Sequence, residues 1–406
     1  MSDALTEKQA FLVLNAIPGA GSVARNRLLG ALGGDPSAVL KAGVRALREA
    51  GATEAAAAAL GAWREHFDPA AEERRLARIG AYFISQKDGD YPKLLRELPD
   101  PPIGLYGAGR IDPARPCIAI VGTRRATPYG LGIARALGAG LARAGVCVVS
   151  GLARGIDAAA HEGALSASGA TAAILGCGVD ICYPPEHRDL TRRIAGAGAL
   201  FSEFPLGRQP EPMAFAMRNR IISGMSSAVV VVESAPDGGA MITARFACEQ
   251  GRTVFAVPGR IDQPLSSGCH QLIRDGATLL TGVDEIFEEL SHLPGFNSRT
   301  GAAPGVDGGG GPPSGPRRSI GLPRPGPVEG RTAPRALLAL EAGAGLEDRG
   351  HSVMACFADG ASLGVDAVAA KTGLAPQQVC AALMALELKG FLARSIDGAY
   401  QLQTQS

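Results

Sequence analysis

Apolar residues gather in short runs along the middle of the chain, and each run has the length of a strand. The runs cover residues 117–122, 146–151, 171–176, 199–203, 228–233 and 253–259. Each run is almost uninterrupted in apolar residues, which is typical of strands covered on both faces of a sheet. Segments with helical spacing separate the runs. This alternation predicts an α/β domain of Rossmann type around a parallel sheet.

The pattern changes on both sides of this central block. Before it, Ala, Leu and Arg recur at helical spacing. After it comes a Gly- and Pro-rich stretch with too few apolar groups to offset the entropy of ordering, and then a block that reads as helices and a strand pair. We expect a helical domain at 1–80, a connector at 81–115, the Rossmann-like domain at 116–290, a linker at 291–333 and a winged-helix domain at 334–406.

Composition limits the partners and the compartment. The 406 residues carry a formal net charge of +1, so locally arranged arginines would have to hold any polyanion. The first residues lack a signal-peptide pattern, and no run of about 18 uncharged apolar residues predicts a membrane span. The eight cysteines form no CxxC pair and mostly lie in apolar runs. We therefore expect reduced, buried thiols in a cytoplasmic protein without membrane contact.

Two turns after predicted strands combine glycine with arginine. Their residues are Gly122, Thr123, Arg124, Ser150, Gly151 and Arg154. The carboxyl ends of parallel strands share one edge of a sheet, and helices that begin there offer free N–H groups, so these turns predict a phosphate site. A guanidinium can hold a phosphate with two parallel hydrogen bonds. Neither GxGxxG nor GxxxxGK[ST] is present, so we expect no dinucleotide, no ATP and no other cofactor.

A third segment joins an aromatic ring to guanidinium groups at Phe215, Arg218 and Arg220. If the segment is helical, Phe215 and Arg218 share a face, which suits the stacking of an unpaired base beside its neutralised phosphate. An ordinary core position for Phe215 is equally compatible with the sequence. For His161, after the second turn, a packed or capping role is the better explanation.

Several strings of the central block occur together in a known family. In order they are VGTR from Val121, SGLARGID from Ser150, GCGVDICYPP from Gly176, RNRIIS from Arg218 and FAVPG from Phe255. Together they resemble the DNA processing protein A (DprA/Smf) family. The resemblance implies a protein without catalytic residues that binds single-stranded DNA in natural transformation, forms a homodimer through its Rossmann-like domain and loads the RecA recombinase onto the strand.

Some positions depart from the family pattern, and the flanking domains offer more general signals. His187 and His270 stand where the family usually has Asn.

Residues 14–21 fit a helix-hairpin-helix that could offer N–H groups to a DNA phosphate, and fit a plain corner between two helices equally well. The family favours a domain similar to a sterile alpha motif (SAM) there. In the winged helix the second helix offers few DNA-reading side chains, so we expect it to contact protein.

An enzyme is the main alternative function. Rossmann-like proteins of the lysine-decarboxylase-like group cleave nucleoside monophosphates with a PGGxGTxxE motif, and residues 237–243 form a similar glycine turn. Phe246 occupies the position of the catalytic Glu, so that turn has no evident general acid or base. The histidines at 161, 187 and 270 lack recognisable ligand spacing. We expect neither a catalytic residue nor a metal ion.

Overall fold

The computed structural model describes residues 5–296 and, in the carboxy-terminal part, residues 352–357, 361, 363–374, 376–388, 391–394 and 399–402. The chain divides into two compact units, residues 1–303 and 304–406. The linker predicted at 291–333 lies outside the described residues from residue 297 onward. Within the described ranges, no helix is both long enough and apolar enough to cross a membrane.

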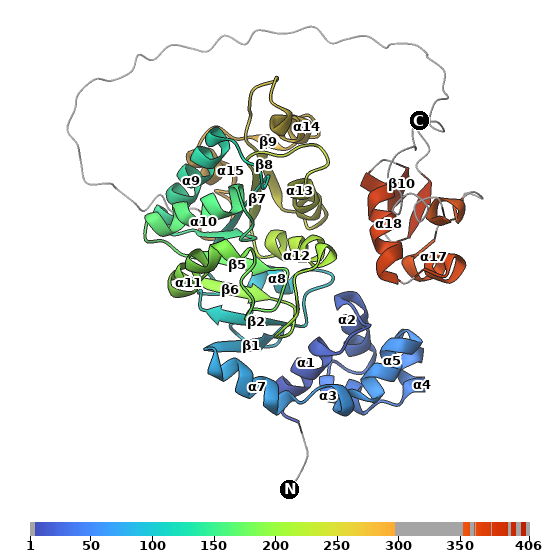
Figure 1. The fold of residues 1–406 in the computed structure, drawn as a ribbon. Helices are drawn as coiled ribbons and strands as arrows, with labels where there is room; N and C mark the ends of the chain where they lie inside the picture. Colours follow the sequence, from blue (N-terminus) through green and yellow to red (C-terminus); the bar gives the residue numbers. More distant parts are fainter. Residues whose placement is uncertain are drawn as a thin grey trace, which may run out of the picture. The chain divides into compact units, whose positions relative to one another are not determined.

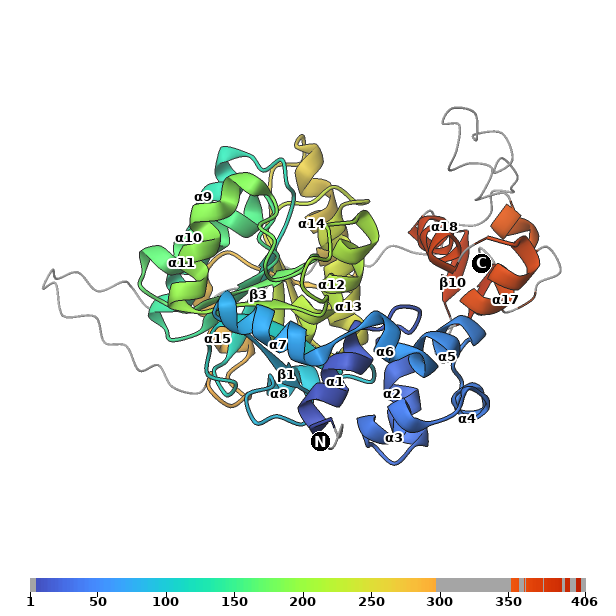
Figure 2. The same cartoon turned by 60° about the horizontal axis from the view of Figure 1, so that its bottom comes forward.

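The first unit begins with helices that pack around a shared apolar cluster. They are α1 (Glu7–Ala16), α2 (Ser22–Ala31), α3 (Pro36–Lys41), α4 (Val44–Glu49), α5 (Glu54–Gly61), α6 (Trp63–His66) and α7 (Pro69–Arg78). Thr6 starts α1 with a capping box, because its hydroxyl accepts from the backbone of Gln9 while the Gln9 amide group accepts from Thr6. The cluster continues from Phe11 into Phe83 of the first strand, and α1 and α7 lie directly against the sheet (Figure 2).

A sheet of nine strands forms the centre of the same unit (Figure 1). The strands are β1 (Ala81–Ser85), β2 (Gly104–Gly109), β3 (Cys117–Val121), β4 (Cys147–Ser150), β5 (Thr171–Leu175), β6 (Ala199–Ser202), β7 (Ala228–Val231), β8 (Thr253–Ala256) and β9 (Thr278–Leu279). Their order is β1-β2-β6-β5-β4-β3-β7-β8-β9. The strands β3 to β8 coincide with the six apolar runs and pair in parallel, which confirms the Rossmann-like prediction.

Helices cover both faces of this sheet (Figure 1). One face carries α9 (Pro128–Arg143), α10 (Ile156–Ser166), α11 (Arg188–Ala197) and α15 (Val283–Glu289); the other carries α8 (Lys93–Arg96), α12 (Pro212–Gly224), α13 (Gly239–Glu249) and α14 (Ser267–Arg274). Alternate residues of β3 enter opposite clusters: Ile118 and Ile120 pack on the α9 side, and Ala119 and Val121 pack on the α12 side. Burial on both faces explains why the strand reads as a continuous apolar run.

The segment predicted as a connector at 81–115 differs from expectation, because it supplies two strands of the sheet. β1 pairs with β2, and β2 pairs with β6, both antiparallel. β2 contains Gly104 and Gly107. A Cβ at Gly104 would overlap the ring of Phe83, and a Cβ at Gly107 would overlap the ring of Tyr82. Glycine is depleted from strands in general. Because β2 has glycine at the positions that face these rings, its sequence does not show the residues that usually indicate a strand.

The strand order places a topological switch beside β3. From β3 the chain proceeds through β4 and β5 to β6, and it then returns to β7 on the opposite side of β3. In open α/β sheets the crevice at the carboxyl ends of the strands near such a switch is where ligands bind. The glycine- and arginine-bearing turns after β3 and β4 both lie at this edge.

The second unit has the predicted winged-helix elements. They are α17 (Val365–Thr372), α18 (Pro376–Leu388), β10 (Leu392–Arg394) and β11 (Tyr400–Leu402), and the two strands pair antiparallel. Gly373 ends α17 in the left-handed region, at φ 69°, which permits the turn between the two helices. Phe357, Val368 and Leu383 belong to the buried cluster of this unit.

Candidate phosphate-binding crevice

The turns after β3 and β4 are tied to each other by backbone contacts. The N–H of Thr123 donates to the carbonyl of Glu233 at 2.7 Å, and the carbonyl of Thr123 accepts from the N–H of Ile156 at 3.3 Å. A Cβ at Gly122 would lie 2.5 Å from the side chain of Ile156, so only glycine allows this approach. The turn with Thr123 and Arg124 therefore lies against the start of α10.

The second turn has a backbone conformation that suits an anion. Leu152 and Gly155 have positive φ angles of 57° and 77°, and a Cβ at Gly155 would overlap the carbonyl of Thr123. Among the described residues, no acceptor is recorded for the backbone N–H groups of Arg124, Arg154 and Gly155. Backbone N–H groups in turns that mix right- and left-handed conformations form concave sites for anions. These three groups are available for a phosphate oxygen.

The amino terminus of α9, by contrast, already has an anion from the chain itself. The carboxylate of Glu233, which is 4% exposed, accepts the N–H of Thr127 at 2.9 Å and also the Thr127 hydroxyl. The Thr127 hydroxyl accepts in turn from the N–H of Gly130. A negative group at this end complements the helix dipole. The expectation that the helix start after β3 is open to phosphate is therefore corrected: the loop before it, not α9, offers free N–H groups.

An aromatic pair and two guanidinium groups lie beside these turns. The Arg124 guanidinium lies 5.5 Å from the centre of the Phe215 ring, and the Arg218 guanidinium lies 5.9 Å from it. Tyr183 lies next to Phe215, with 5.2 Å between the ring centres. Phe215 is half-buried and Arg124 is exposed, so one side of the cluster faces solvent. The structure thus brings Arg124, Phe215 and Arg218 together.

Arg218 forms the buried base of this cluster rather than an open contact. Its side chain is 3% exposed and donates to the carbonyl of Gly151 at 2.8 Å and to the carbonyl of Ile174. Burial lowers the pKa of Arg218 to about 10, and the nearby Asp157 carboxylate opposes that shift. A Cβ at Gly151 would lie 2.5 Å from the guanidinium. Ser150 is also buried, and its hydroxyl donates to the carbonyl of Ile120. These residues shape the crevice from below.

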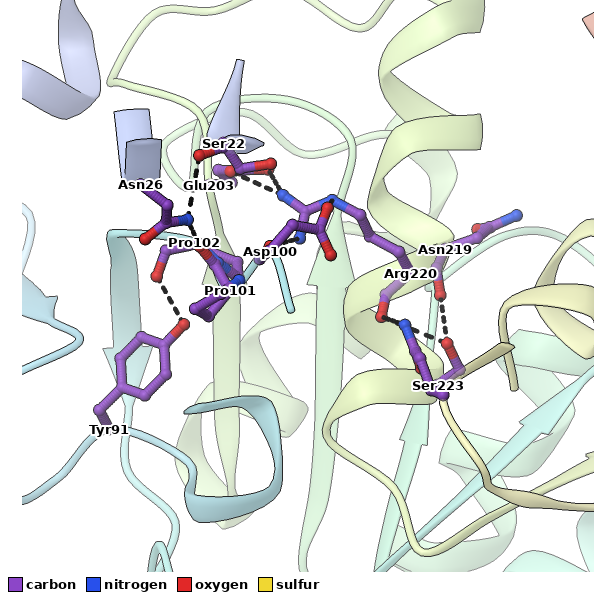
Figure 3. A network of polar contacts seen from close by, with 11 residues as sticks. Ser22, Asn26, Tyr91, Asp100, Pro101, Pro102, Glu203, Asn219, Arg220 and Ser223 are labelled. Carbon is purple, nitrogen blue, oxygen red and sulfur yellow. Dashed lines mark hydrogen bonds and ion pairs between the residues drawn. The ribbon is translucent and has the colours of Figure 1, made fainter. Parts of the chain in front are cut away.

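Arg220 lies in a separate polar network (Figure 3). Its guanidinium donates to both carboxylate oxygens of Glu203 at 2.8 Å and to the carbonyl of Asp100 at 3.1 Å. Both members of the ion pair are buried, at 6% exposure each. Asn26 of α2 donates to the neighbouring carbonyl of Pro101, so the network joins α12 to the amino-terminal helices. This pairing places the Arg220 guanidinium in the domain junction and occupies its donors there.

Several residues around the crevice were missed by sequence reasoning. Tyr183 packs against Phe215, Glu186 pairs with Arg154, and the Nδ1–H of His187 donates to the carbonyl of Leu152 at 3.0 Å. All three belong to the loop after β5 and the short helix η1 (Pro185–His187). The aromatic residue in GCGVDICYPP, directly after a buried strand, was a usable signal for Tyr183. Nothing in the local sequence pairs Glu186 with Arg154, because 32 residues separate them.

The histidines have separate structural surroundings. His161 is fully buried, its Nδ1 lies 2.7 Å from the hydroxyl of Thr171, and burial lowers its pKa to about 3. His270 instead hydrogen-bonds to the carbonyl of Gly259. In the described part of the chain, no three His, Cys, Asp or Glu side chains gather as metal ligands.

The fold and the crevice define a Rossmann-like α/β protein with a winged-helix domain and no P-loop. Known proteins make the assignment more specific. The family model for DNA recombination-mediator protein A matches residues 82–291, and the model for the DprA winged helix domain matches residues 335–398. The chain belongs to the DNA recombination-mediator protein A family, DprA.

Individual relatives agree with this assignment. Protein Smf of Synechocystis is 43% identical over 52% of this chain and 54% of its own length. A putative DNA processing protein DprA of Mycobacterium tuberculosis is 42% identical over 59% of this chain and 66% of its own length. The structure of DNA processing protein A from Streptococcus pneumoniae is 31% identical, with a TM-score of 0.62 over 70% of this chain and 99% of that one. The chain thus matches between half and two thirds of the length of these two curated relatives.

The family also decides between the two classes of function considered from the sequence. Its members are DNA-binding recombination mediators rather than enzymes. The nucleoside-monophosphate hydrolase alternative is therefore not favoured. The glycine turn on which it rested leads into α13, where Phe246 stands at the position of the missing Glu.

Proposed function

We propose that this chain binds single-stranded DNA in the crevice between the turns after β3, β4 and β5. The observation that carries the proposal is the exposed Arg124 guanidinium over the Phe215 ring, next to backbone N–H groups without an acceptor among the described residues. Arg124 and Arg154 would hold the phosphates together with the N–H groups of Arg154 and Gly155. Gly122, Thr123, Ser150, Gly151 and Arg218 would hold those groups in position.

The aromatic pair supports a single strand over a duplex. A base that stacks on a protein ring must first leave its own stack, and a single strand offers such bases at low cost. Phe215 and Tyr183 present rings beside the guanidinium groups that would neutralise the backbone. In this proposal Arg220 contributes through the domain junction and not through contact with DNA.

Binding should depend strongly on salt and not on any nucleotide cofactor. Contacts between arginine and phosphate release counterions, so the logarithm of the affinity should fall linearly with the logarithm of salt concentration. Fluorescence anisotropy with a labelled oligothymidine measures this slope directly. A duplex of the same length is the control and should bind more weakly. Absence of oligonucleotide binding at low salt would refute the proposal.

We further propose, from the family resemblance, that the chain acts in natural transformation in the cytoplasm, as a homodimer through its Rossmann-like domain that loads RecA. RecA should form filaments sooner on strands coated with single-strand-binding protein when this chain is present. A protein that binds the oligonucleotide but leaves filament formation unchanged would contradict the RecA role alone.

A further inference from the structure

A carboxylate lies within the cationic crevice. Glu186, in η1, accepts a hydrogen bond from Nε of Arg154. Both side chains are about half exposed, at 49% and 52%. This contact raises the pKa of Arg154 and lowers the pKa of Glu186, as expected for an ion pair. The guanidinium that would meet a phosphate is therefore held by an anion from the chain itself.

The carboxylate is held in this place by its neighbours. His187, the next residue, donates to the carbonyl of Leu152 at 3.0 Å, which ties η1 to the turn that carries Arg154. Tyr183, three residues before Glu186, packs on Phe215, and the Phe215 ring lies under Arg124. The loop that supplies the aromatic platform thus also supplies the anion, so the pairing is part of the crevice and not a chance contact at its rim.

We propose that Glu186 is an intramolecular competitor of DNA phosphate for Arg154. The inference rests on the proposed function, because it concerns the regulation of the same site. A carboxylate offers two acceptor oxygens, as a phosphate diester does. Unlike a phosphate within a DNA strand, it brings no bases and no further phosphates to the crevice. An exposed ion pair is weak, so a strand that also stacks its bases and contacts Arg124 displaces it. A lone phosphate ion lacks those additional contacts and competes poorly, which makes the crevice selective for strands.

Replacement of Glu186 tests the competitor directly. Glu186→Gln should tighten binding of an oligothymidine about fivefold at low salt, because both the competing ion pair and the repulsion of phosphate are removed. Glu162→Gln is the matched control: Glu162 pairs with Arg135 in the middle of α10 and α9, with 41% and 51% exposure. The control should change the affinity by less than twofold. Equal effects of the two substitutions, or none for Glu186→Gln, would overturn the proposal.

A second measurement separates competition for Arg154 from general repulsion. In an Arg154→Ala background, Glu186→Gln should tighten binding clearly less than it does in the wild-type background, because only the repulsion of phosphate is then removed. If Glu186→Gln tightens binding equally in both backgrounds, Glu186 acts only through its charge and the proposal fails. Failure of the proposed function would give another result: the wild-type protein itself would not bind the oligonucleotide, so no effect of Glu186 could be measured.

Discussion

Simultaneous replacement of Arg124 and Arg154 by Ala should weaken the binding of a single-stranded oligonucleotide at least about a hundredfold at low salt. Each charge-assisted hydrogen bond to a phosphate contributes about 1.5–3 kcal/mol, and two such groups are removed together. Both side chains are exposed, so their loss should leave the fold intact. The slope of log affinity against log salt should also become shallower by about two phosphate contacts. Fluorescence anisotropy over a salt series measures both quantities.

A matched variant controls for the loss of two positive charges. Arg45 and Arg135 are also exposed and each pairs with a Glu, but they lie in α4 and in the middle of α9, outside the crevice. Their double replacement by Ala should weaken binding by only a few fold. If the Arg124 and Arg154 variant bound DNA as well as wild type, the phosphates would have to lie elsewhere on the protein.

Arg220→Met should lower the free energy of unfolding by about 3–5 kcal/mol. The substitution removes the guanidinium that donates to both oxygens of the Glu203 carboxylate, which is buried at 6% exposure, and the loss of one member of a buried ion pair costs about this much. Chemical denaturation followed by circular dichroism measures the loss. The native fraction should bind an oligonucleotide with nearly wild-type affinity, because the Arg220 guanidinium is occupied in the domain junction.

A double variant separates loss of the ion pair from loss of packing. Glu203→Leu with Arg220→Met removes both charges and should recover most of the stability, since apolar replacements of a buried pair are often neutral. If Arg220→Met were as stable as wild type but bound DNA far more weakly, Arg220 would contact DNA, as the sequence analysis predicts.

The sequence alone determined the central architecture and the location of the crevice. Apolar runs at 117–122 and 228–233 specify strands buried on both faces, and parallel strands bring their carboxyl ends to one edge. Glycines such as Gly122 and Gly155 indicated the turns, because close approach or positive φ permits little else there. These are local properties, readable within a few residues, and they place Arg124 and Arg154 at the carboxyl edge of the sheet.

Only the tertiary structure decided which arginines remain open. Arg218 and Arg220 stand two residues apart in one helix, yet Arg218 lies beneath Phe215 and Arg220 pairs with Glu203 in the domain junction. Nor could the sequence predict the pairing of Arg154 with Glu186, or the strands within 81–115. The physical reason is common to all of them: the partner of a charge or of a glycine-rich strand is chosen by contacts between distant segments, which leave no periodic pattern in the chain.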